Sequence, residues 1–165
     1  MPQQFGKDLE ARLGISARAV GSGEEAVRGA DIVVTSTTST EPVVQGAWLA
    51  PGTHVNAIGA NYEYRRELDY EAVARASVIA TDDTDQVRYE ATDLAAPVRE
   101  GLLSWDTVLP LGSIVAGAAK GRTNAQDITL FKSLGVAIED VALAIRAYEK
   151  ALGQGVGQKL PNLSG

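Results

Sequence analysis

The sequence has 165 residues, 45% of them hydrophobic and 22% charged, which is the composition of a globular domain with a core of its own. A formal net charge of -6 argues against nucleic acid as a partner, because phosphate binding needs clustered Lys and Arg. A single His and no Cys exclude disulfides and argue against a zinc site. The sequence also lacks a secretory leader and any apolar run of about 18 residues, so we expect a cytoplasmic protein that does not span a membrane.

Segments of helical and strand character alternate along the first two thirds of the chain. The expected elements are a helix over 3–13, a strand over 16–20, a helix over 22–28, a strand within 30–39, a strand over 53–58, a helix over 66–75, a strand over 77–81, and a helix over 87–103 interrupted around Pro97. The run Ile32-Val33-Val34 has no polar alternation, which is typical of a strand covered on both faces. The alternation predicts an α/β fold with a parallel sheet of βαβ units.

The last third of the chain has a different pattern. We expect a helix of small residues over 110–120, a strand over 127–132 and a long helix after Gly135. Apolar residues follow one another along this last segment at spacings of four and three, the strongest helical period in the sequence: Leu134, Ile138, Val141, Ile145, Tyr148 and Leu152. This apolar stripe predicts a packing partner, and therefore a chain that self-associates when the stripe is uncovered.

Three loops leave the carboxyl ends of expected strands, the place where open parallel sheets bind ligands. They are TSTTST (35–40), GANYEYR (59–65) and DDTD (82–85). Hydroxyl groups and free backbone amides suit a nucleotide, and Gly59 would let the backbone approach one closely. The alternative is that the first loop is a cap and turn and that Gly59 is only a turn residue.

Four further places in the sequence carry residues that could serve a site. Asp82-Asp83 could bind a hard cation or could form a strand-end turn and a helix cap. His54 could be a general base, although no acidic or nucleophilic residue neighbours it in sequence. Arg65-Arg66 could bind an anion or begin a solvated helix, and Lys132-Ser133 stands at a strand-to-helix junction without a specific motif.

The glycine fingerprint of a dinucleotide-binding turn does not occur in this sequence. Such a turn follows a strand, reads G-x-G-x-x-G and opens a helix whose N-terminus binds pyrophosphate. The nearest match, Gly21-Ser22-Gly23, is followed by Glu24-Glu25, whose charges would repel a pyrophosphate. We therefore interpret Ser22 as a helix N-cap.

Read together, the segments 30–44, 52–69 and 111–144 resemble the ornithine cyclodeaminase/mu-crystallin family, most specifically in the block GRTNAQDITLFKSLGVAIEDVA. The resemblance implies an NAD(P)-dependent enzyme with an N-terminal substrate and dimerisation domain followed by a Rossmann domain. By that pattern residues 1–125 are an incomplete NAD(P)-binding Rossmann domain, and residues 126–165 are its last strand and a C-terminal helix that packs on the N-terminal domain. The sequence would then begin within the helix after the second Rossmann strand, and we expect this chain by itself to be inactive.

The family's site residues can be placed on this sequence one by one. Thr35 falls where a hydroxyl meets the cofactor, and Arg65 falls where a basic residue contacts the dinucleotide. Ile58, Gly59, Ala60 and Asn61 fall on the loop beneath the nicotinamide. Ser133 resembles the cofactor-contacting residue before the last helix, and Leu134 the neighbouring position on the substrate side. No metal site is implied.

Asn61 departs from the family pattern, because cyclodeaminases of the family have an aspartate at that position. An amide cannot take up a proton or carry negative charge near pH 7, so Asn61 cannot be the corresponding general base. The resemblance therefore favours hydride transfer to or from a small amino or imino acid, as in alanine dehydrogenases and ketimine reductases. The alternatives are ornithine cyclodeamination to proline and a non-catalytic binding protein like mu-crystallin. A homo-oligomer is implied in each case.

Overall fold

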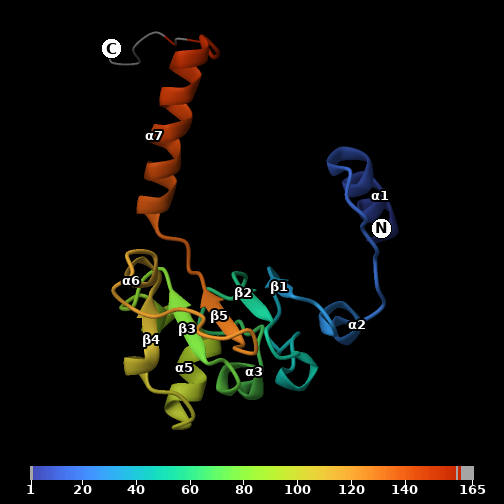
Figure 1. The fold of residues 1–165 in the computed structure, drawn as a ribbon, viewed down its shortest axis with the longest axis vertical. Coiled ribbons are helices and arrows are strands. Elements are labelled where there is room, and N and C mark those ends of the chain that lie inside the picture. The colour runs from blue at the N-terminus through green and yellow to red at the C-terminus, as the bar shows by residue number, and fades with distance from the viewer. Residues whose placement is uncertain (1, 159, 161–165) are drawn as a thin grey trace. The chain divides into compact units, whose positions relative to one another are not determined.

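A computed structural model describes residues 2–158 and 160 and contains a five-stranded parallel sheet (Figure 1). The strand order is β1-β2-β5-β3-β4, so the last strand of the chain is inserted at the centre of the sheet. The strands are β1 (Ile32–Thr35), β2 (His54–Ala57), β3 (Val78–Thr81), β4 (Val108–Pro110) and β5 (Thr129–Lys132). The α-helices are α1 (Pro2–Leu13), α2 (Gly23–Val27), α3 (Tyr70–Ala74), α4 (Val87–Glu90), α5 (Thr92–Arg99), α6 (Leu111–Val115) and α7 (Ala137–Gln154). The expected α/β class is confirmed.

The five strands end in register. Their last residues form one row across the sheet: Thr35, Ala57, Lys132, Thr81 and Pro110. Because all strands run in the same direction, the segments that follow them begin at one common edge of the sheet. This edge, which we call the carboxyl edge, brings together loops that are up to about a hundred residues apart in sequence.

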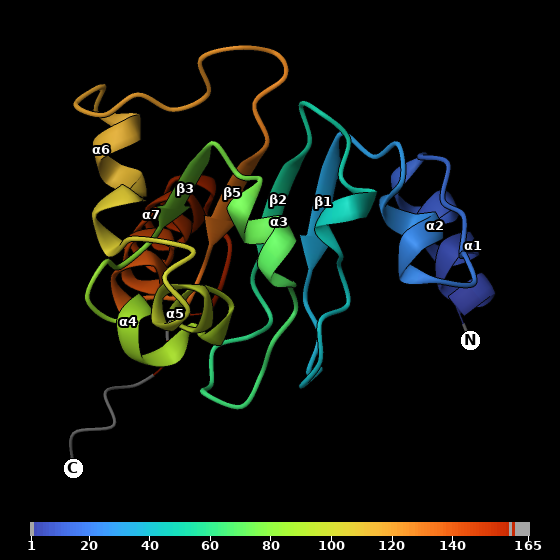
Figure 2. The ribbon, with the colours of Figure 1, turned by 90° about the horizontal axis from the view of Figure 1, so that it is seen from below.

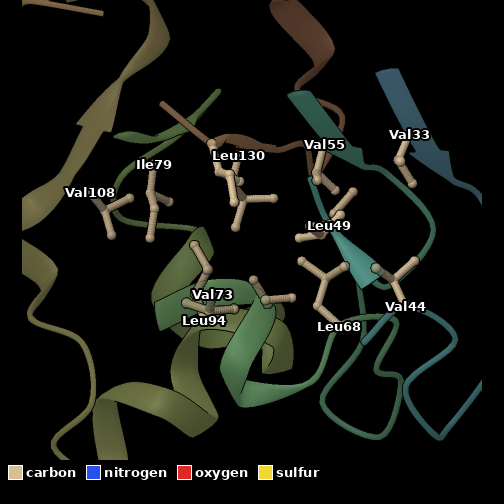
Figure 3. Close-up of a cluster of buried hydrophobic side chains, with 14 of the residues drawn as sticks. Val33, Val44, Leu49, Val55, Leu68, Val73, Ile79, Leu94, Val108 and Leu130 are labelled. Atoms are coloured by element: carbon tan, nitrogen blue, oxygen red, sulfur yellow. The ribbon is translucent and has the colours of Figure 1, made fainter. Parts of the chain in front are cut away.

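One face of the sheet carries the hydrophobic core. Helices α3 and α5 and the segment between β1 and β2 cover this face (Figure 2). A second row of residues points from the same face into the core: Val33, Val55, Leu130, Ile79 and Val108 (Figure 3). The apolar side chains that meet this row include Val44, Leu49, Leu68, Val73 and Leu94, all at most 3% exposed. Burial of this size is the main source of stability in a small α/β domain.

The opposite face of the sheet is only partly covered. Leu111 and Ile114 of α6, together with Arg122, lie over β2, β3 and β5 and enclose a hollow of about 340 Å³. On β1, Ile32 and Val34 point to this face and are 64% and 59% exposed. The sequence predicts cover on both faces for this strand, and the described residues provide it on one.

The chain divides into two compact units, one ending at Leu134 and one starting at Gly135. Strand β5, which the sequence analysis groups with the C-terminal helix, pairs with β2 and β3 inside the first unit. Helix α7 belongs to the second unit and ends at Gly155, whose left-handed backbone (φ 64°) suits glycine. Its apolar stripe is exposed: Ile138, Val141, Ile145, Tyr148 and Leu152. Among the described helices, none is long and apolar enough to cross a bilayer.

Two expected elements differ because tertiary contacts override local pattern. The helix expected over 66–75 begins at Tyr70, with Asp69 as its N-cap accepting from the Ala72 amide at 2.7 Å. Arg66 and Glu67 lie outside any helix, and Leu68 forms a bridge with Val44. The helix expected over 87–103 is interrupted at Ala91 and not at Pro97, which lies inside α5.

Three smaller differences concern short or exposed segments. Residues 16–20 form no strand, although the hydroxyl of Ser22 does accept from the Glu25 amide as the expected cap of α2. The helix expected over 110–120 ends at Val115. Strand β4 lacks a sequence signal, because it has only three residues and ends in a proline at the edge of the sheet.

Candidate functional site at the carboxyl edge

The loops that follow β1 and β2 are joined by one buried side chain. The carboxylate of Glu67 accepts three hydrogen bonds: from the Thr35 hydroxyl at 2.8 Å, the Thr37 amide at 2.6 Å and the Gly59 amide at 2.9 Å. Burial by itself would raise the pKa of Glu67, but the hydrogen bonds from Thr37, Thr35 and Gly59 outweigh it, and the pKa lies below its usual range. Glu67 is therefore an anion that fixes the two loops relative to each other.

Gly59 is required where the two loops touch. A Cβ atom at this position would lie 2.3 Å from the Thr37 nitrogen and 2.5 Å from a carboxylate oxygen of Glu67. The first of these neighbours is backbone and cannot rotate away. The glycine thus does more than turn the chain: it allows the β2 loop to lie directly against the β1 loop.

The main chain of Glu67 is anchored as firmly as its side chain. Its amide donates to Asp93 Oδ1 at 2.8 Å, and the Leu68 amide donates to the same oxygen at 2.9 Å. Its carbonyl accepts from the amides of Val43 and Val44 at 2.8 and 3.0 Å. Every polar group of this residue has a partner, so its position is set independently of any ligand.

Behind Glu67 lies a buried ion pair. Lys132 Nζ is 3.5 Å from Asp93 Oδ2, and both side chains are fully buried. Lys132 also donates to the Ala57 carbonyl at 3.3 Å. Burial raises the pKa of Asp93, opposed by Lys132 and by the amides of Leu68 and Glu67, and burial lowers the pKa of Lys132, opposed by Asp93 and Glu67. The lysine thus offsets the two buried carboxylates.

Asp82 joins two further strand ends. Its Oδ2 accepts from the Ser133 hydroxyl at 2.9 Å and from the Leu134 amide at 2.7 Å, which ties the end of β3 to the end of β5. Asp83 accepts from the amides of Asp85 and Gln86, both at 2.8 Å, in the turn before α4. Asp83 thus stabilises the turn, as the sequence allows, whereas Asp82 links two strands and neither aspartate is the N-cap of α4, which is Gln86. Within the described part of the chain no cluster of three potential metal ligands occurs.

Most of the sequence-predicted site residues lie at the carboxyl edge. Thr35, Ile58, Gly59, Ala60, Asn61, Ser133 and Leu134 end or directly follow β1, β2 and β5. Thr35 and Gly59 meet at Glu67, and Ser133 and Leu134 meet at Asp82. Ala60 and Leu134 are buried, so they shape the edge from beneath, whereas Ile58 is 44% exposed.

Arg65 is held within its own loop. Its guanidinium carbon lies 4.9 Å from the centre of the Tyr62 ring and 5.8 Å from that of Tyr64, and the two rings stack at 5.7 Å. Asn61 and Tyr62 line a shallow hollow with Glu63, Tyr89 and Glu90. Arg65 therefore packs against the aromatic rings of its own loop.

His54 lies away from the carboxyl edge. It begins β2, and its ring nitrogens contact the Thr129 hydroxyl at 2.7 Å and the Asn56 side-chain oxygen at 3.3 Å. Both partners lie on the partly covered face of the sheet. The contacts account for the ring nitrogens, and they place His54 among structural residues.

The chemistry of the carboxyl edge fits the nicotinamide end of a dinucleotide. Exposed Ile58 offers an apolar surface to an aromatic ring. Ser133 donates its hydroxyl proton to Asp82, so its oxygen lone pairs can accept from an amide N–H. Beneath Ile58 and Ser133, the close packing of Gly59 against Thr37 leaves the two loops little freedom to move.

Two residues central to this edge, Glu67 and Asp93, are not among those that the sequence singles out, and Lys132 is noted there only as a charge at a strand-to-helix junction. Glu67 stands in the charge cluster RRELD, which resembles a solvated helix start. A weak signal exists for the other two, since Asp93 is a lone acid in the apolar stretch ATDLAAPV and Lys132 ends an apolar strand. A charge on the buried side of such a segment indicates a paired partner.

Comparisons with known proteins agree with the fold and identify a family. A model of the ornithine cyclodeaminase/mu-crystallin family matches residues 2–155. The chain is 38% identical over 157 residues to a Δ1-pyrroline-2-carboxylate reductase of Bacillus cereus, covering 94% of this chain and 48% of that protein.

Two solved structures are similar over nearly the whole chain. The Δ1-pyrroline-2-carboxylate reductase of Thermococcus litoralis, solved with NADH and L-proline, has a TM-score of 0.88 and 42% identity, covering 95% of this chain and 49% of that one. An archaeal alanine dehydrogenase dimer with bound NAD has a TM-score of 0.82 and 40% identity, with coverages of 97% and 49%. The chain therefore spans about half the length of the curated relatives it matches.

Proposed function

Because the chain belongs to the ornithine cyclodeaminase/mu-crystallin family, we propose that it forms the nicotinamide side of an NAD(P)-dependent oxidoreductase acting on a small amino or imino acid. One observation carries the proposal: the ends of β1 and β2 are fixed together by Glu67, those of β3 and β5 by Asp82, and all four lie in one row. The residues that the family resemblance assigns to the cofactor lie on these loops. A bound nicotinamide would supply the hydride chemistry.

The residues of this chain would position the reactants and shape the site. Ile58 would support the ring, Ser133 would accept from the carboxamide, and Thr35 would hold the β1 loop through Glu67. Leu134 would border the substrate. Asn61 can donate and accept hydrogen bonds but cannot act as a base, which supports hydride transfer over ornithine cyclodeamination.

We extend the proposal to a homo-oligomer in the cytoplasm. The archaeal alanine dehydrogenase is a dimer. In this chain, the exposed apolar stripe of α7 offers a surface that a partner could cover. The absence of cysteine suits a reducing compartment.

Saturation-transfer NMR with NADH and NADPH tests cofactor binding, because it detects weak ligands. If this chain forms the nicotinamide side, the nicotinamide protons should receive more saturation than the adenine protons. Gly59→Ala, which would push the β1 and β2 loops apart, should abolish the transfer. Gly112→Ala is the matched control, since a Cβ there meets no atom within 4 Å. Transfer that is absent, or that favours adenine, would overturn the proposal.

A further inference from the structure

Glu67 is a buried carboxylate at the carboxyl edge to which the family resemblance assigns no part. Its side chain is fully buried and accepts three hydrogen bonds without donating any. Two of its donors are backbone amides from different loops, Thr37 after β1 and Gly59 after β2. A carboxylate is the side chain that can accept from all three at once, since it has two oxygens with two lone pairs each and no N–H.

The surroundings of Glu67 hold it in place and balance its charge. The Glu67 amide donates to Asp93, and the Glu67 carbonyl accepts from the amides of Val43 and Val44. Lys132 forms an ion pair with Asp93 at 3.5 Å. The buried group thus contains two acids, Glu67 and Asp93, and one base. A carboxylate fixed at both ends in this way acts as a rigid spacer between the loops it binds.

We propose that Glu67 is a positioning residue: it holds the loop of Thr37 against the loop of Gly59 at the separation that a nicotinamide ring requires. This inference rests on the proposed function and goes one step beyond it. Glu67 would touch neither cofactor nor substrate. Its contribution would be to arrange Thr35, Ile58 and Gly59 before the ligand arrives, so that binding does not have to order the two loops.

The test uses the whole chain and Glu67→Gln, which keeps the volume of the side chain but replaces one acceptor oxygen by a donor. In ¹⁵N-labelled protein the amide resonances of Thr37 and Gly59 should move, because they lose a charged acceptor. The dissociation constant for reduced nicotinamide mononucleotide should rise by about tenfold or more, the loss expected for hydrogen bonds to a charged group.

Asp127→Asn is the control for a merely structural effect. Asp127 precedes β5 at the opposite edge of the sheet and accepts four hydrogen bonds from Thr123 and Asn124. This variant should lower stability while leaving nicotinamide affinity unchanged. If Glu67→Gln does not fold, Thr35→Val removes one donor at nearly constant shape and should raise the same dissociation constant two- to fivefold, roughly the loss of one such bond.

The two proposals fail in different ways. If Glu67→Gln, or Thr35→Val in its place, binds as tightly as the wild type, the positioning role is overturned and cofactor binding stands. If both Asp127→Asn and the Glu67 variant lose affinity in proportion to their loss of stability, the effect is structural and the positioning role is again overturned. A wild-type chain that shows no nicotinamide transfer overturns the proposed function, and the positioning role with it.

Discussion

The amide of Gly59 donates to the carboxylate of Glu67 at 2.9 Å, so the glycine that begins the connection between β2 and α3 is bonded to an acid eight residues further along it. The same carboxylate reaches the Thr37 amide at 2.6 Å. Gly59 thus allows the loops after β1 and β2 to lie close together, and Glu67 holds them there by hydrogen bonds. Three predictions follow from this contact and its surroundings, and a fourth concerns helix α7.

Gly59→Ala should lower the free energy of unfolding by about 1–3 kcal/mol, the usual cost of forcing extra atoms into a packed site. The added Cβ would lie 2.3 Å from the Thr37 nitrogen, so the two loops must separate. Gly112→Ala should instead leave stability unchanged or raise it by up to about 1 kcal/mol, because it replaces glycine inside helix α6 where no atom is near. Urea unfolding followed by circular dichroism measures both, and equal effects of the two substitutions would contradict the packing argument.

The sequence predicts which loops lie at the carboxyl edge better than it predicts the hydrogen bonds of Glu67 that join them. Short segments rich in apolar or β-branched residues mark β1, β2, β3 and β5, and loops that follow parallel strands must share one edge, so the positions of Thr35, Gly59 and Ser133 follow from pattern alone. Glu67 does not, because its three partners lie 8 to 32 residues away in sequence. Its neighbours Arg66 and Asp69 make the segment look solvated.

The same reasoning explains the helix boundary that the sequence misplaces. The Leu68 amide is taken by Asp93, 25 residues later, and this contact keeps the chain out of a helix up to Asp69. Local propensity is worth a fraction of a kcal/mol per residue, less than a hydrogen bond to a buried charge. The spacing of apolar residues along the chain cannot predict tertiary contacts of this kind, and several of them lie in the candidate site.

Lys132→Met should be strongly destabilising, by about 3–5 kcal/mol, because it leaves Asp93 buried beside Glu67 without a cation. Adding Asp93→Asn should recover part of this loss: an asparagine oxygen can still accept from the amides of Glu67 and Leu68, and no unpaired charge remains. A double-mutant cycle built from unfolding free energies measures the coupling between the two positions. Losses that simply add would show that the pair is not coupled.

The stability difference between the wild type and Glu67→Gln should depend on pH. The pKa of Glu67 in the folded chain lies below its ordinary value of 4.5, so its stabilising contribution is fully present above that value and is lost as the pH falls through the folded pKa. The difference should therefore be constant above about pH 5.5 and shrink below 4.5. The charge of Glu67 also helps to raise the pKa of Asp93, so the interaction between the two acids is part of the measured difference. Unfolding by urea at a series of pH values gives the curve, and a difference that grows toward acid pH would contradict the assignment.

The apolar stripe of α7 should make the isolated chain self-associate. Ile138 and Ile145 are 70% and 53% exposed and lie two turns apart on the same side of the helix. Replacing both with Lys should shift the chain toward the monomer, which sedimentation velocity at increasing concentration would detect. Ala147→Lys with Gln154→Lys adds the same charge on the other side of α7 and should leave association unchanged. A wild-type chain that stays monomeric throughout, or a control pair that dissociates it equally well, would show that the stripe is not the contact surface.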